Sequence, residues 1–279
     1  MDVVRVVCVV ALLTGLAAPL FGCGGSPTVP SPSTSAAATR TLELTGDPLF
    51  VSRGDSRQFT AMLVQPDAAP QDVTAQATWS VSNGNAVSVS GGLVEALRPG
   101  GADVTASFLG YTATRRAGVA ALEDCFAYDT AGLLYQKVQG EAIWVVASPW
   151  LEGYALHAWF TSEADAQRAF LLMQRYGEEC FVGRDNQQPD RLAYIVRYWQ
   201  APTGLQTTID DEDCEAYDPA ALTIGSLGTA GWALQAGGRE VARLAHEGDA
   251  VRILLVAREH GSRCLIGRGH EPYVMGYWR

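Results

Sequence analysis

Hydrophobic and polar residues alternate in short segments between residues 41 and 120, and turn-forming residues separate these segments. Strict alternation places every second side chain on a buried face, which is the pattern of a half-buried antiparallel strand. The segments predicted to be strands are 42–44, 57–64, 77–81, 87–89, 93–96, 103–108 and 113–119. A series of about seven short strands predicts an all-β sandwich for residues 41–120.

The hydrophobic pattern changes after residue 121, because two segments there have the spacing of an amphipathic helix. A helix turns once every 3.6 residues, so apolar residues three and four positions apart form one stripe. The first stripe is Ala166, Ala169, Phe170 and Met173, and the second is Ala250, Ile253, Leu254 and Ala257. Ser162 with Asp165 resembles a capping box before the first helix, and Gly177 follows that helix. Strand-like segments flank both helices, so this part is predicted to be α+β.

Residues 121–202 and 211–279 carry the same motifs in the same order, which indicates an internal duplication. The repeated motifs are Cys125 to Asp129 with Cys214 to Asp218, Cys180 to Arg184 with Cys264 to Arg268, and Tyr198-Trp199 with Tyr277-Trp278. We expect two tandem βββαββ repeats, each with its helix on a small antiparallel sheet, packed about a pseudo-twofold axis. The Cys-x-x-Tyr-Asp and Cys-x-x-Gly-Arg motifs resemble repeats in uncharacterised bacterial proteins, and this resemblance implies no function.

The first 22 residues have the pattern of a secretory signal. Arg5 precedes an apolar run, residues 6–20, that is too short to span a bilayer comfortably. The run ends in Leu20-Phe21-Gly22-Cys23, which resembles the lipobox of bacterial lipoproteins. This resemblance implies that residues 1–22 are removed and that Cys23 carries a diacylglycerol thioether, with acyl chains that hold the protein at a membrane. A plain secretory signal is the alternative interpretation.

Residues 23–40 are predicted to be a flexible, lipid-anchored linker. They consist mainly of Gly, Ser, Pro, Thr and Ala, and such a composition cannot bury enough apolar surface to fold. The three residues after Cys23 are Gly24-Gly25-Ser26, without the Asp that marks inner-membrane retention in Gram-negative lipoproteins. The lipoprotein resemblance therefore implies a location in the cell envelope, at the outer membrane or the cell surface.

The segment of predicted strands also resembles a known family. The runs 77–83, 86–89, 92–97 and 104–106 are similar in order and spacing to the bacterial immunoglobulin-like domain, group 2. The resemblance implies a sandwich in which Trp79 fills the space between sheets and Gly91-Gly92 forms a hairpin turn. Members of this family occur in bacterial surface proteins and adhesins, mostly as rigid spacers, and they carry no catalytic residues.

The cysteines and the charge limit the chemistry. Removal of the signal takes Cys8 and lipidation uses Cys23, which leaves Cys125, Cys180, Cys214 and Cys264. An even number in an exported chain predicts disulfides, and the duplication predicts the pairs Cys125–Cys180 and Cys214–Cys264. The formal net charge of −10 repels nucleic acid, so we expect no nucleic-acid partner.

Three kinds of repeated residue are candidates for ligand binding. Asp129 and Asp218 could meet Arg184 and Arg268 in a cleft for an anionic or sugar ligand, but capping and turn-stabilising roles in the fold are the preferred interpretation. The rings of Trp199 and Trp278 could form an aromatic platform for sugars. Packing between the two copies is the preferred interpretation for these rings as well.

No catalytic residues, cofactor or metal site are predicted. The four histidines lack metal-ligand spacing, and the chain contains no nucleophile elbow and no phosphate loop. Residues 210–213, all acidic, are interpreted as a solvated linker rather than a calcium site. We therefore expect a non-enzymatic lipoprotein for binding, adhesion or display, with the membrane and an envelope glycan or surface protein as partners. An exported hydrolase and a purely structural envelope component are the alternatives.

Overall fold

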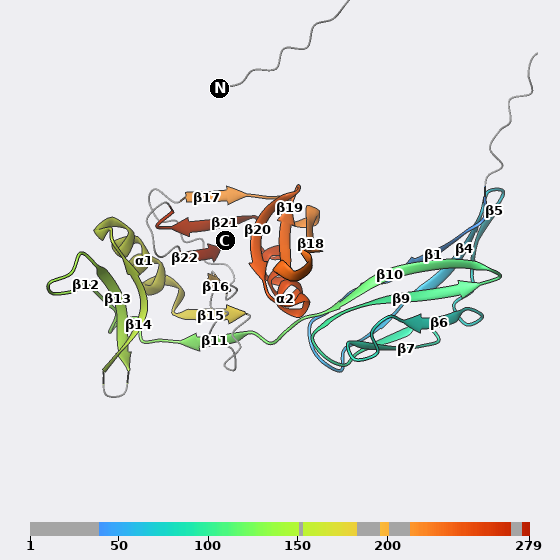
Figure 1. Cartoon of the computed structure of the whole chain (residues 1–279), viewed down its shortest axis with the longest axis horizontal. Coiled ribbons are helices and arrows are strands. Elements are labelled where there is room, and N and C mark those ends of the chain that lie inside the picture. The colour runs from blue at the N-terminus through green and yellow to red at the C-terminus, as the bar shows by residue number, and fades with distance from the viewer. Residues whose placement is uncertain (1–38, 151–152, 183–195, 201–212, 269–274) are drawn as a thin grey trace, which may run out of the picture. The chain divides into compact units, whose positions relative to one another are not determined.

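The computed structural model describes residues 39–150, 153–182, 196–200, 213–268 and 275–279 (Figure 1). Residues 39–119 contain strands and no helix. The predicted signal peptide, Cys23 and nearly all of the linker lie outside the described residues. The strands are β1 (Thr41–Thr45), β2 (Leu49–Phe50), β3 (Ser56–Gln58), β4 (Thr60–Gln65), β5 (Ala68–Asp72), β6 (Thr78–Val81), β7 (Val87–Ser90), β8 (Leu93–Ala96), β9 (Gly100–Phe108) and β10 (Tyr111–Val119). They pair as β1-β4-β5, β2-β10-β9-β6 and β3-β8-β7.

The predicted strands of this part are found, with two additions and one division. The predicted strand 57–64 is divided at Phe59 into β3 and β4, and β2 and β5 have no counterpart in the prediction. All five residues of β5 are exposed and one of them is Pro70, so this edge strand has no alternation to detect. Trp79 packs against both apolar clusters of this part, and Gly91 and Gly92 have the positive φ values of 56° and 85° expected at the hairpin turn.

From residue 124 onward, four strands, an α-helix and two strands occur twice in the same order. The first series is β11 (Asp124–Ala127), β12 (Leu134–Lys137), β13 (Trp144–Trp150), β14 (Gly153–Phe160), α1 (Glu163–Tyr176), β15 (Glu178–Val182) and β16 (Val196–Gln200). The second is β17 (Asp213–Ala216), β18 (Leu222–Ser226), β19 (Trp232–Ala236), β20 (Arg239–Leu244), α2 (Glu247–Arg258), β21 (Ser262–Ile266) and β22 (Met275–Trp278), with short 3₁₀ turns at η2 (Pro219–Ala221) and η3 (Gly228–Ala230). Below, these series are called the first and second half.

The prediction of three strands before each helix is wrong, because the structure has four. All residues of β11 are exposed, and β17 is exposed at both ends, so neither strand has an apolar periodicity. The interpretation of residues 210–213 as a linker is also corrected at its last residue, since Asp213 begins β17.

Both halves contribute to one six-stranded sheet with the order β11-β15-β16-β22-β21-β17. The two central strands, β16 and β22, are parallel, and the other neighbours are antiparallel. Each helix also packs on a small antiparallel sheet of its own half, as predicted: α1 on β12-β13-β14 and α2 on β18-β19-β20. The prediction did not include the larger sheet that joins the two halves. Figure 1 shows α1 with β12–β14 on one side of this sheet and α2 with β18–β20 on the other.

Through the shared sheet, each half contributes side chains to both hydrophobic cores. The cluster around α1 includes Trp199 from the first half and Cys264 and Tyr277 from the second. The cluster around α2 includes Cys180 and Tyr198 from the first half together with Trp278 from the second. Since neighbours on a strand point to opposite faces, each Tyr-Trp pair places one ring in each core.

The predicted helices are confirmed. The side-chain oxygen of Ser162 accepts a hydrogen bond from the Asp165 backbone at the start of α1, and Gly177 ends the helix with a φ of 65°. Three of the four residues in the predicted stripe of α1 are buried, and all four in α2 are. These apolar faces fix each helix against the sheet.

The two predicted disulfides are confirmed. Cys125 is directly opposite Cys180 on β11 and β15, with 4.1 Å between their Cα atoms. Cys214 is directly opposite Cys264 on β17 and β21, with a Cα separation of 3.9 Å. Each bridge therefore joins a strand at the edge of the shared sheet to its neighbour.

Candidate functional site

A pocket lies at the edge of the shared sheet, where β17 and β21 meet β20 of the second half. Its volume is about 330 Å³. Five charged side chains line it: Glu215, Arg239, Glu240, Arg263 and Arg268. The two apolar residues in its wall are Val241 and Leu265.

Strand register brings two of these charged residues together. Glu215 is directly opposite Arg263, next to the directly opposite Cys214 and Cys264. The side chain of Cys264 packs in the α1 core, so Glu215 and Arg263 point to the other face, the one that α2 covers. After β21, Gly267 adopts a φ of 80°, and the chain turns there before Arg268.

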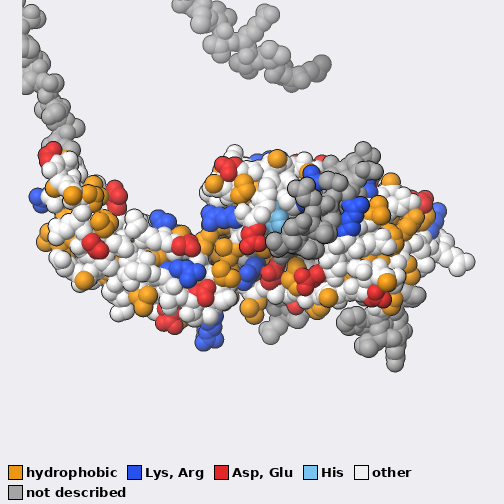
Figure 2. All heavy atoms as spheres, turned by 180° about the vertical axis from the view of Figure 1, so that it is seen from behind, with side chains coloured by type: hydrophobic (Ala, Val, Ile, Leu, Met, Phe, Trp, Pro, Cys, Tyr) orange, Lys and Arg blue, Asp and Glu red, His pale blue; other side chains and the backbone are white. Residues whose placement is uncertain are grey.

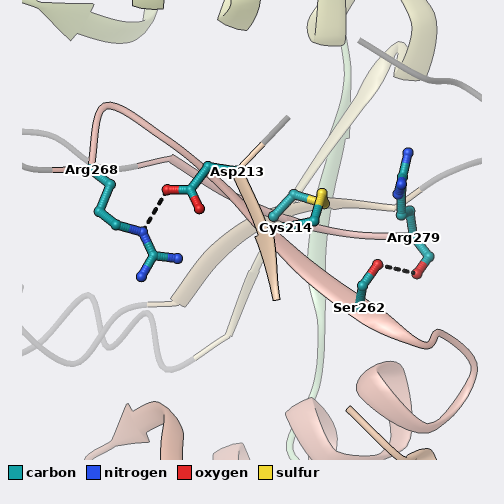
Figure 3. Close-up of a disulfide and its surroundings, with 6 residues drawn as sticks. Asp213, Cys214, Ser262, Arg268 and Arg279 are labelled. Carbon is teal, nitrogen blue, oxygen red and sulfur yellow. Dashed lines mark hydrogen bonds and ion pairs between the residues drawn. A yellow bond between two sulfur atoms is a disulfide. The ribbon is translucent and has the colours of Figure 1, made fainter. Parts of the chain in front are cut away.

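Arg268 and Arg239 neutralise the acidic groups at this edge. The Nε atom of Arg268 donates to the Oδ2 atom of Asp213 at 2.6 Å, beside the Cys214 disulfide in Figure 3, and its Nη1 atom donates to Glu215 at 2.9 Å. Arg239 donates to the other oxygen of the Glu215 carboxylate. The hydrogen bond from Arg268 is the main reason that the pKa of Glu215 lies below its ordinary value, and the charge of Arg239 acts in the same direction.

Glu240, the other carboxylate of the wall, is also paired. The Nε and Nη2 atoms of Arg243 donate to its two oxygens at 3.0 and 2.7 Å. This two-pronged geometry is the strongest form of an arginine–carboxylate contact. Both acidic groups of the pocket therefore already have a cationic partner.

Arg263 differs from the other arginines of the pocket. Its guanidinium carbon lies 5.2 Å from the centre of the Trp278 ring, which is a cation–π contact. Its Nε atom is buried and has no hydrogen-bond partner among the described residues. Gly276 leaves room for the guanidinium, because a Cβ atom there would lie 3.2 Å from the Nη2 atom. Burial lowers the pKa of Arg263, and the nearby Glu215 opposes this effect.

The lining of the pocket carries one positive charge in excess. Three arginines face two glutamates, and counting Asp213 and Arg243, which pair with lining residues, leaves the same excess. Figure 2 shows acidic and basic side chains interspersed over the face of the molecule that it draws. A guanidinium that is partly removed from water without a carboxylate paired to it is unfavourable, and an anion that pairs with it offsets that cost.

The corresponding place in the first half holds a hydrogen-bonded polar array instead. The hydroxyl of Ser148 lies 2.7 Å from the Nε2 atom of His157, and the Nδ1 atom of His157 lies 2.8 Å from the Oε2 atom of Glu179. All three residues are buried, and Ser148 is 2 % exposed. A serine, a histidine and a carboxylate in this sequence of contacts can activate the hydroxyl as a nucleophile, provided that a substrate reaches it.

The correspondence between these two places follows from register. Glu179 and Arg263 each precede the second cysteine of their half. His157 is the extra residue where the register of β13 and β14 shifts, and Val241 is the extra residue where that of β19 and β20 shifts. The first half thus places a glutamate beside a histidine, where the second places an arginine beside a valine.

Those of the predicted ligand residues that the structure describes do not meet in one cleft. Arg268 lies in the pocket, but Asp218 caps η2 by accepting from the Ala220 backbone at 2.9 Å. Asp129 accepts from the Ala131 backbone at 2.9 Å, also a turn contact. Arg184 lies outside the described residues. For both aspartates the structure therefore corresponds to the capping interpretation.

Trp199 and Trp278 are fully buried, in the α1 and α2 cores respectively. A surface platform made of these two rings is therefore absent from the described residues, and their position corresponds to the packing interpretation. The reason is the shared sheet, which has a helix on each face and leaves neither side of the central strands open.

Sequence reasoning missed Glu215, Arg239 and Arg263, and also the array of Ser148, His157 and Glu179. A signal for part of the pocket was present in the disulfide. If two bridged cysteines are directly opposite on antiparallel strands, the residue after one is opposite the residue before the other. The predicted Cys214–Cys264 bridge therefore implies that Glu215 and Arg263 are neighbours.

One group of side chains in the described part of the chain has metal-ligand proximity, namely Glu123 with Cys125 and Cys180. Its two sulfur atoms are joined in a disulfide and are not thiolates. Neither helix in the described ranges is long and apolar enough to cross a membrane. The sequence matches no protein-family model and no curated protein.

Proposed function

We propose that the protein is a lipid-anchored component of the cell envelope that binds a ligand through its second half and does not catalyse a reaction. In this proposal Cys23 carries the lipid and residues 24–40 form the tether. Residues 41–120 are a bacterial immunoglobulin-like domain, group 2, that acts as a spacer, and 121–202 and 211–279 are the two copies of a duplicated unit. The ten strands of the spacer, and the order of elements, disulfides and register shifts common to both halves, support this division.

The observation that carries the binding function is Arg263. A guanidinium that is held on an aromatic ring, partly removed from water and left with a buried, unbonded Nε atom is costly for folding alone. A binding site explains that cost, because a ligand anion would complete the charge pair. Its location in a cavity of about 330 Å³ gives such a ligand space.

The binding function is tested by retention of the mature protein on fractionated envelope material and on a glycan array. We expect retention that Arg263→Gln abolishes. Arg57→Gln is the matched control, because Arg57 also lies over an aromatic ring, 5.9 Å from the centre of Phe50, but has Asp47 as an ion-pair partner. Equal retention of wild type and Arg263→Gln would refute the assignment.

The anchor is tested separately by Cys23→Ser in the full chain. We expect the variant to leave the membrane fraction, since the acyl chains have no other attachment point in the proposal. A variant that still sediments with membranes as wild type does would contradict the lipid anchor and leave the pocket unaffected.

The array of Ser148, His157 and Glu179 favours a second candidate function, an exported serine hydrolase. In such an enzyme the Ser148 oxygen attacks a carbonyl carbon while His157 takes the hydroxyl proton and Glu179 stabilises the charged ring. Ser148 is only 2 % exposed, which is why binding is preferred. A fluorophosphonate probe that labels wild type and not Ser148→Ala would establish the hydrolase, whereas no labelling of either would assign the array to the core.

A further inference from the structure

The two halves suggest what the pocket lacks. In the first half, a carboxylate and an imidazole form a hydrogen-bonded pair between the shared sheet and β14. In the second half, the residues at the corresponding positions are Arg263 and Val241, and both line the pocket. The valine cannot pair with the guanidinium, so the pocket contains one half of an ion pair and an open volume beside it.

The charges of the residues that line the pocket favour an anion with a single negative charge. Arg263 supplies the one excess positive charge, whereas the charges of Glu215 and Glu240 are already paired. A second negative charge on the ligand would meet those two carboxylates at close range, and like charges a few ångströms apart repel each other. A monoanion therefore fits the pocket better than a phosphate dianion.

The shape and chemistry of the pocket wall also restrict the chemical class of the ligand. A planar carboxylate can form two parallel hydrogen bonds with a guanidinium, a geometry that suits arginine. The oxygens of Glu215 and Glu240 can accept hydrogen bonds from hydroxyl groups, while Val241 and Leu265 offer an apolar wall for carbon-bound hydrogens. The volume of about 330 Å³ is near the lower end for ligand sites, which suits about one ring.

We propose that the pocket binds a hydroxylated monocarboxylate, a hexuronic acid or a sugar residue of that kind, with its carboxylate on Arg263 and its hydroxyls toward Glu215 and Glu240. This inference rests on the proposed binding function and names its ligand class. Arg268 and Arg239 act as positioning residues, because they hold the Glu215 carboxylate in place.

The experiment is calorimetric titration of the mature full chain with three probes of similar size: D-glucuronate, D-glucose and D-glucose 1-phosphate. We expect glucuronate to bind saturably and the other two at least about tenfold more weakly, since a charged hydrogen-bonded pair is lost or a second charge is added. Arg263→Gln is expected to reduce glucuronate affinity by about tenfold or more, and Arg263→Lys to restore only part of it, because lysine lacks the planar fork. Arg57→Gln is the control with unchanged affinity.

A second variant keeps the test sharp if Arg263→Gln unfolds. Arg263→Met removes the guanidinium without placing a carboxylate opposite Glu215, and we expect it to fold and to lose glucuronate binding. Preference for glucose 1-phosphate or for glucose would overturn the ligand class while leaving a binding function. If none of the three probes binds but retention on envelope material still depends on Arg263, the ligand class is likewise overturned and the binding function stands. Failure of both measurements would overturn the ligand class and the binding function together.

Discussion

The two halves of the α+β part share one order of strands and helices and differ in what they bury beside the shared sheet. In the first half, Glu179 has His157 as a partner, and His157 in turn contacts Ser148. In the second half, Arg263 and Val241 stand at the corresponding positions and a pocket opens there. A repeated fold thus holds its structural contacts constant, while the positions around them diverge in chemistry.

The contrast also separates contacts that serve the fold from contacts that serve a site. Tyr128 donates to the Met173 carbonyl at 2.9 Å, and Tyr217 donates to the Ala257 carbonyl at the same distance. Both tyrosines lie three residues after the first cysteine of their half. Because this contact is the same in both halves, it belongs to the fold, whereas the difference between Glu179 and Arg263 is where function can reside.

The largest expected effect on the free energy of unfolding is the loss of a disulfide, and we expect it to be equal in the two halves. Replacing Cys125 and Cys180 by Ser, or Cys214 and Cys264, opens links with sequence separations of 55 and 50 residues. In the chain-entropy model each loss costs about 4 kcal/mol of the free energy of unfolding. Denaturant unfolding of the two variants under identical conditions measures this, and a difference of several kcal/mol between them would show that one bridge is strained or redundant.

A somewhat smaller effect distinguishes the halves. His157→Ala takes a hydrogen-bond partner away from the buried Glu179 carboxylate, and we expect a loss of about 3 kcal/mol. Val241→Ala in the second half removes only two methyl groups, for about 1.5 kcal/mol. Thermal and urea unfolding provide both values. Equal losses would indicate that the polar array contributes no more to stability than ordinary apolar packing does.

Arg263→Met is expected to be neutral or to stabilise the ligand-free protein by about 1 kcal/mol, because a flexible apolar side chain replaces a charge that is partly desolvated and uncompensated. Glu179→Met in the first half is the matched comparison and should destabilise, since it breaks a formed pair. Unfolding measured without ligand decides this point. A large loss for Arg263→Met would assign Arg263 to the fold instead of a site.

The smallest effect is a pH dependence at the edge of the pocket. The pKa of Glu215 is held below its ordinary value of 4.5 by Arg268, so its ion pairs contribute stability above that pH. This contribution is lost as the pH falls below 4.5 through the lowered pKa, because the folded state must then take up the proton. Comparing wild type and Glu215→Gln by thermal unfolding between neutral and acidic pH isolates the effect. Parallel curves for the two proteins would contradict it.

Local patterns predicted the local structure. The stripe that begins at Ala250 is buried in α2, and the strand predicted at 93–96 has the same bounds as β8. In both cases the period of the hydrophobic residues reports which face is covered. The disulfides were predictable for a similar reason, since each half repeats one cysteine at its start and one after its helix.

Pairing between distant strands was not predictable. The parallel contact between β16 and β22 joins residues that are far apart in sequence, such as Trp199 and Tyr277, and it leaves no period in the sequence. The pocket depends on that sheet and on the packing of β20 against it, so its residues share no motif. Arg268 was found because it is repeated, whereas Arg263 is a departure from the repeat and was missed for that reason.

The central parallel pair has a consequence for how such a chain can be cut or assembled. A chain that ended after β16 would leave an open strand edge and uncover the apolar faces of Tyr198 and Cys180, which α2 covers in the full chain. A second copy of the same fragment could cover them by placing its own β16 alongside, related by a twofold axis parallel to the strands. We therefore expect an isolated first half to form a symmetric homodimer, of which the full chain is the covalently joined, asymmetric counterpart.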